Sequence, residues 1–122
     1  MGDTWFTGVA DELARCLLEA EACAEACEAL LATVNESADA ELRRLAVDIL
    51  VAPAAIARAL IELIDHPPRL VLAACRLCRE SAQHAAAQLE ALGGRLDTTQ
   101  TIEALRASVS SCERLLDAAA YL

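Results

Sequence analysis

Three short turn signals divide this chain of 122 residues into four long segments of helix-forming residues. Alanine, leucine, glutamate and arginine, which all favour helices, fill most positions between the turns. A residue that precedes proline resists the α conformation, and glycine commonly follows the last turn of a helix. The turn signals are Asn35-Glu36-Ser37, Asp65-His66-Pro67-Pro68 and Gly93-Gly94. We therefore predict helices over about residues 4–35, 38–64, 68–93 and 98–120.

Four helices joined by short loops predict an all-α protein with the up-down-up-down topology of a four-helix bundle. No glycine- or serine-rich linker divides the chain, so we expect residues 1–122 to form a single domain. Ser37 is the expected N-cap of the second helix. Pro53, within that helix, is expected to kink it or to remove one backbone hydrogen bond.

Charge and composition exclude two classes of partner. The net charge of −9, with arginine as the only basic residue type apart from histidine, and the aromatic content of 2 % argue against binding nucleic acid. The most apolar stretch, residues 45–64, carries Asp48, Arg58 and Glu62, which a membrane span would bury at great cost. The first residues lack the basic and apolar regions of a secretory signal, so we expect a cytoplasmic protein.

Six cysteines are the unusual feature of the composition. In a reducing compartment, regularly spaced cysteines serve as metal ligands or redox groups more often than as disulfides. Cys16, Cys23 and Cys27 are seven and four residues apart and share one narrow stripe of the first helix, beside leucine and alanine. Cys75 and Cys78 share a face of the third helix, and Cys112 lies at the centre of an apolar seam on the fourth. All six side chains should therefore face the core.

Residue counting from the loops also predicts the height of each thiol along the bundle. Five thiols from three helices should crowd one region, and Cys27 alone should lie nearer the loops. We hypothesise that Cys112 joins Cys75 and Cys78 across the core. Thiolates without histidine or carboxylate partners suit Cu(I) best and Zn(II) second. The alternative is that each cysteine packs as a small hydrophobic residue.

Three runs of sequence resemble the cysteine-rich four-helix-bundle copper-storage proteins: ACAEACEALL at 22–31, AELRR at 40–44 and ACRLCRE at 74–80. In that family, CxxC and CxxxC repeats line the interior of the bundle and their thiolates hold many Cu(I) ions. The resemblance extends from about Cys16 to Ala119. It implies a non-enzymatic, cytosolic copper-binding protein and, because such bundles tend to associate, a homo-oligomer.

This chain has fewer cysteines than the family pattern, and its second helix has none, so the resemblance implies low capacity for copper. The positions where the pattern would place cysteine hold Ala20, Leu30, Leu45, Ala52, Ile56, Ala82, Ala85, Leu105, Ser108, Leu115 and Ala119. The ligands that the resemblance implies are the six matching positions, Cys16, Cys23, Cys27, Cys75, Cys78 and Cys112.

Other functions remain open on the sequence. The first is a helical scaffold or interaction protein whose cysteines only fill the core. The second is an enzyme that uses thiol redox chemistry at Cys75-Arg76-Leu77-Cys78. The sequence supports this hypothesis less well, because His84 lies nearly opposite Cys75 on the helix. A diiron centre is weaker still, since neither His66 nor His84 has a glutamate three residues before it.

Overall fold

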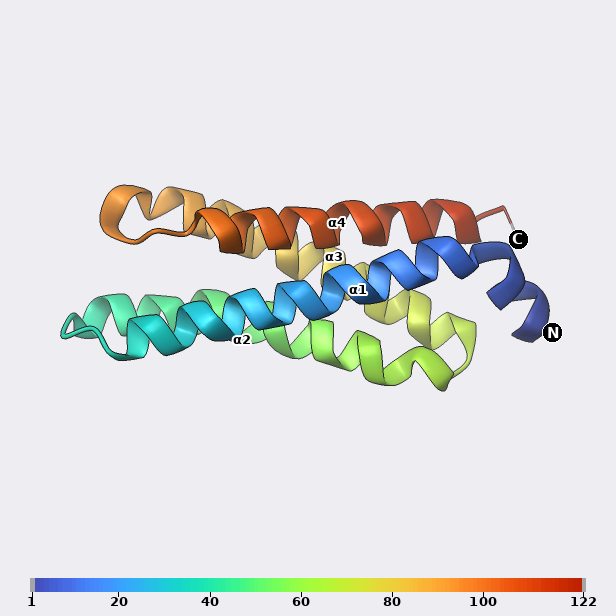
Figure 1. Cartoon of the computed structure of the whole chain (residues 1–122), viewed down its shortest axis with the longest axis horizontal. Helices are drawn as coiled ribbons and strands as arrows, with labels where there is room; N and C mark the ends of the chain where they lie inside the picture. The colour runs from blue at the N-terminus through green and yellow to red at the C-terminus, as the bar shows by residue number, and fades with distance from the viewer. Residues whose placement is uncertain (1, 122) are drawn as a thin grey trace.

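Four antiparallel α-helices make up the structure, a computed structural model that describes residues 2–121 (Figure 1). The helices are α1 (Gly2–Asn35), α2 (Ala40–Glu62), α3 (Pro68–Ala91) and α4 (Thr99–Ala119). Two short 3-10 turns, η1 (Leu63–Asp65) and η2 (Gly93–Arg95), follow α2 and α3. Because α1 and α3 each pack against both α2 and α4, they lie diagonally across the bundle. The predicted all-α, up-down-up-down four-helix bundle is confirmed.

The helix ends lie close to the predicted positions, with one correction at the start of α2. Asp39, and not Ser37, is the N-cap, and its Oδ1 accepts the backbone N–H of Leu42 at 3.1 Å. The Ser37 hydroxyl oxygen instead accepts the N–H of Asp39 at 3.1 Å, which orders the turn before the helix. After α3, Gly93 adopts a φ of +65°, the left-handed conformation that glycine tolerates best.

The bend in the bundle falls in α1 and not at the proline of α2. α2 continues without a break through Pro53, whose side chain is buried. Of the two expected effects, only the loss of the hydrogen bond that proline cannot donate remains. In α1, Val9 has non-helical backbone angles of φ −126° and ψ 17°, and the first turns of the helix swing away from the axis (Figure 1). Trp5, before this bend, packs half-buried against the core.

Aliphatic side chains and cysteines form two adjoining clusters along the bundle axis. Cys23 and Cys27 belong to the cluster nearer the α1–α2 turn, which also contains Leu50 and Leu105. The other four cysteines belong to the second cluster, with Leu60, Leu115 and several alanines. Small alanine and cysteine side chains let the helices approach closely, so the thiols of different helices come within contact distance.

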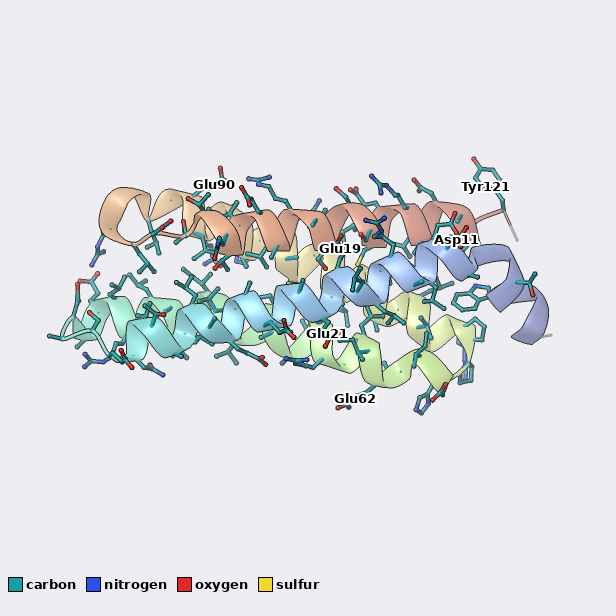
Figure 2. All side chains as sticks on the ribbon, viewed as in Figure 1. Asp11, Glu19, Glu21, Glu62, Glu90 and Tyr121 are labelled. Atoms are coloured by element: carbon teal, nitrogen blue, oxygen red, sulfur yellow. The ribbon has the colours of Figure 1, made fainter. Side chains whose placement is uncertain are left out.

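Charged side chains cover the outside of the bundle (Figure 2). Arg58 of α2 donates to both carboxylate oxygens of Glu28 on α1, at 2.7 and 3.3 Å, and this guanidinium lowers the pKa of Glu28. Arg95 similarly joins the turn after α3 to Asp39 at 3.3 Å. These pairs are exposed, so they fix position more than they add stability. Over the described residues, no helix is long and apolar enough to cross a membrane.

A core leucine should contribute far more to stability than an exposed one. Leu105 is fully buried, and Leu18 is 63 % exposed. Leu105→Ala is expected to lower the free energy of unfolding by about 2–5 kcal/mol, because it leaves a cavity between the helices. The same change at Leu18 should alter it by less than about 0.5 kcal/mol. Denaturant unfolding measures both, and equal losses would contradict the described packing.

Candidate metal centre

All six cysteines are free thiols and all are buried, with an exposed fraction of at most 1 %. The cysteines lie on the apolar faces of their helices, so each thiol points into the core, as their spacing in the sequence predicts. α2 contributes no thiol and instead packs Ala57 and Leu60 into the same cluster. Of the family positions without cysteine, Ala52 is exposed on α2, whereas Ala20, Ala82 and Ala85 are buried.

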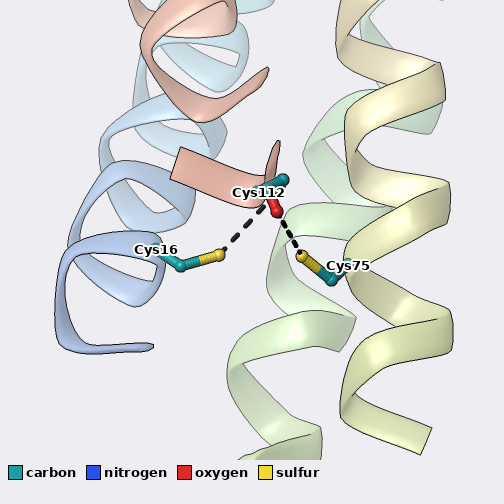
Figure 3. Close-up of side chains that lie close together, drawn as sticks. All are labelled: Cys16, Cys75 and Cys112. Carbon is teal, nitrogen blue, oxygen red and sulfur yellow. Dashed lines mark hydrogen bonds between the residues drawn. The ribbon is translucent and has the colours of Figure 1, made fainter. Parts of the chain in front are cut away.

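Three thiols from three helices meet in the second core cluster, and we call them the three-thiol cluster. Cys16 of α1, Cys75 of α3 and Cys112 of α4 place their Sγ atoms within 4.8 Å of one another (Figure 3). The Sγ atoms of Cys16 and Cys112 are 3.7 Å apart. The Cys75 thiol donates to the backbone oxygen of Cys112 at 3.5 Å.

The grouping contains the predicted contacts and one more. Cys112 meets Cys75 and shares a hydrogen bond with Cys78, as expected, and it also meets Cys16. The Sγ of Cys78, one turn along α3, lies in addition 3.6 Å from the Ser108 hydroxyl. The prediction placed the loops after the first and third helices at one height. In the structure the α1–α2 turn projects beyond the α3–α4 turn, which changes the register of the helices (Figure 1).

The remaining thiols continue from the three-thiol cluster toward the α1–α2 turn. Cys112 raises the pKa of Cys78 through a hydrogen bond, and burial raises it further. Cys23 and Cys27, on adjacent turns of α1, share a hydrogen bond that raises the pKa of Cys23 and lowers that of Cys27. The charges of Cys78 and Cys112 also act on Cys23. Each thiol therefore affects the pKa of a neighbouring thiol, so the six cysteines form one electrostatically coupled group.

Ionisation within the three-thiol cluster is shared unequally. Hydrogen bonds with the Cys112 and Cys16 thiols lower the pKa of Cys75 to about 4, against the opposing effects of burial and of Cys78, and Arg79 lowers it further at longer range. The pKa of Cys16 is raised, first by its hydrogen bond with Cys112, then by that with Cys75 and by burial. One negative charge is thus favoured in the cluster, and a second is opposed until a cation enters.

The geometry suits a metal ion that prefers sulfur. A metal bonded to three thiolates at about 2.3 Å lies in a triangle whose edges are about 4 Å, close to the Sγ separations here. Among the described residues, the group contains neither histidine nor carboxylate, which hard ions and structural zinc sites commonly use. Soft thiolates alone favour Cu(I). His66 and His84 are both exposed and lie outside this group.

These features define a four-helix bundle lined with cysteines, three of which meet in its core. The family model described as copper storage protein (Csp) matches residues 9–117, which is most of the chain, and the chain belongs to that family. No curated protein and no solved structure gives a significant match. The predicted resemblance to copper-storage proteins is therefore confirmed.

The raised thiol pKa values make stability depend on pH in alkaline solution. Cys16, Cys23 and Cys78 keep their protons in the folded chain above pH 9, whereas the unfolded chain, with thiol pKa values near 9.0, releases them. Stability should fall above pH 9 by about 1.4 kcal/mol per pH unit for each retained proton. The pKa values of Cys75 and Cys27 are lowered, so these two thiols stabilise the folded chain as the pH rises toward 9.0. Above the unfolded pKa their contribution no longer increases, so it does not offset the decline.

Thermal unfolding of the reduced, metal-free chain between pH 8 and pH 11 measures this dependence. The sequence contains no lysine, so few other groups titrate there. Cys78→Ala should make the decline less steep by one retained proton. A stability that stays constant from pH 9 to pH 11 would show that the thiols do not hold their protons as described.

Proposed function

We propose that this protein binds and stores or buffers Cu(I) in the cytoplasm, with low capacity, through its inward-facing cysteine thiolates. The observation that carries the proposal is the three-thiol cluster, in which Cys16, Cys75 and Cys112 lie within 4.8 Å of one another in a copper storage family member. Copper is the cargo, and no catalytic step is proposed. The site residues are Cys16, Cys23, Cys27, Cys75, Cys78 and Cys112, and free thiols fit a reducing cytoplasm.

Charge explains why such a site takes up a cation. Each Cu(I) that binds neutralises one buried thiolate, so it drives the release of the protons that Cys16 and Cys78 hold in the empty protein. The first ion is expected at the three-thiol cluster, where Cys75 ionises most readily. Further ions are expected toward Cys23 and Cys27, the pair on adjacent turns of α1. Zn(II) is the weaker cargo, because it usually requires a fourth ligand.

An anaerobic titration of the reduced protein with Cu(I), against a chromophoric chelator, tests the proposal. We expect two or more Cu(I) per chain. Cys75→Ala and Cys112→Ala should each abolish the tightest equivalent and weaken competition for copper at least about 10-fold. Cys27→Ala is the matched control, since it removes an equally buried thiol but should leave the tightest equivalent intact.

The scaffold alternative makes the opposite prediction. If the cysteines only fill the core, the protein binds no Cu(I), its thiols react equally with and without copper, and its helix content and oligomeric state stay unchanged. Zinc binding as tight as copper binding would contradict the proposed metal preference but not the site.

Self-association is a further part of the proposal, supported by aliphatic side chains that the isolated chain leaves in solvent. They are between 39 % and 63 % exposed and comprise Leu18, Val47, Val51, Leu70 and Leu77. Light scattering should give a mass that is a multiple of 12.9 kDa, and Val51→Glu with Leu77→Glu should lower it. A mass of 12.9 kDa for the unchanged protein would contradict the homo-oligomer.

A further inference from the structure

The three-thiol cluster is closed to solvent, and this restricts which ligands can reach it. Cys16, Cys75 and Cys112 are fully buried, in a core cluster that also contains the fully buried Leu60 and Leu115. A ligand therefore reaches the thiols only when the helices open locally. An ion must lose its hydration shell to cross such an apolar layer, whereas a small uncharged molecule loses far less. Burial thus favours a ligand that arrives without charge.

The net charge of the occupied cluster matters for the same reason. Among the described residues, the group of ligand atoms contains three sulfurs and neither carboxylate nor imidazole. One Cu(I) bonded to three thiolates leaves two negative charges in the core, and one Zn(II) leaves one. A buried charge that lacks a partner is costly. A trivalent centre bonded to all three thiolates leaves no net charge, so its valence matches the number of thiols.

The separation of the sulfur atoms suits a pyramidal centre of this kind. The side chains of Cys16 and Cys75 point toward Cys112 from two sides (Figure 3), and the three Sγ atoms lie within 4.8 Å of one another. The Sγ atoms of Cys16 and Cys112 are 3.7 Å apart. With bonds of about 2.3 Å, a planar centre holds its sulfurs about 4 Å apart, and a pyramidal centre with angles of about 95° holds them about 3.4 Å apart. The observed contact lies between these two values.

We propose that the three-thiol cluster binds trivalent arsenic, which it takes up as uncharged arsenous acid, As(OH)3. Three arsenic–oxygen bonds break and three arsenic–sulfur bonds form, and each hydroxide leaves with a thiol proton as water. Where Cys75 starts as the thiolate, the proton for its water comes from the solvent. Arsenic stays trivalent and no sulfur is oxidised. Arsenic binding goes beyond the proposed copper storage and does not rest on it.

The other three thiols do not form a second site of this kind. Cys23 and Cys27 share a hydrogen bond on adjacent turns of α1 and supply two sulfurs. Cys78 contacts the Ser108 hydroxyl at 3.6 Å. Within the part of the chain that the structure describes, the three-thiol cluster is the group that gathers three ligand atoms within 4.8 Å. We therefore expect one tightly held arsenic atom per chain.

Sodium arsenite, added to the reduced, metal-free protein at neutral pH, tests the proposal. Mass spectrometry of the intact protein should show one added arsenic atom and the loss of three hydrogen atoms. X-ray absorption at the arsenic edge should show three sulfur neighbours and no oxygen. Two sulfur neighbours with one oxygen, or a protein that retains no arsenic, would overturn the proposal.

Single substitutions test the location of the site. Cys16→Ala and Cys112→Ser should each weaken arsenite binding at least about 10-fold, because two sulfurs remain and removal of even a supporting residue has an effect of that size. Cys112→Ser keeps the size of the side chain, and circular dichroism checks that each variant folds. Cys27→Ala is the matched control, since it removes an equally buried thiol and should leave three sulfur neighbours. Equal weakening in the control would contradict the assigned site.

Copper and arsenic test two separate claims. Because both are assigned to Cys16, Cys75 and Cys112, one equivalent of bound Cu(I) should block arsenite uptake. Simultaneous binding of the tightest copper equivalent and of arsenic with three sulfur neighbours would contradict the shared site. A chain that binds Cu(I) but no arsenic overturns arsenic binding and leaves copper storage intact. A chain that binds arsenic but no Cu(I) refutes the proposed function and supports arsenic binding.

Discussion

Contact between thiols of three different helices is the interaction on which the site depends. Cys16, Cys75 and Cys112 can meet only because the bundle brings α1, α3 and α4 together at one height, with small side chains between them. The contact also sets the chemistry, because hydrogen bonds with the Cys112 and Cys16 thiols lower the pKa of Cys75. Core packing and thiol ionisation therefore depend on the same residues.

The sequence predicts helices and faces well, because both follow from local rules. Proline, glycine and asparagine mark the turns, and the spacing of cysteine with leucine and alanine places every thiol inside. The sequence predicts Ser37 as the N-cap of α2, but the N-cap is Asp39. Serine and aspartate have similar capping propensity, so the conformation of the turn decides which of the two caps the helix. α2 accommodates Pro53 without a break, because the residues on both sides of it remain helical.

The grouping of the thiols could not be read from residue counts alone. Counting 1.5 Å per residue assumes loops of equal height, but the α1–α2 turn extends beyond the α3–α4 turn (Figure 1). Cys112 therefore meets Cys16 in addition to the predicted partners Cys75 and Cys78. The relative displacement of packed helices depends on side-chain interlocking across the bundle.

X-ray absorption at the copper edge tests whether Cys16, Cys75 and Cys112 together bind Cu(I), as we propose. With one equivalent of Cu(I), the unchanged protein and Cys27→Ala should both show sulfur neighbours alone, at about 2.3 Å. Cys75→Ala should lose one sulfur neighbour or fail to hold the ion. Oxygen or nitrogen neighbours in the unchanged protein, or a spectrum that Cys75→Ala leaves intact and Cys27→Ala alters, would contradict the claim.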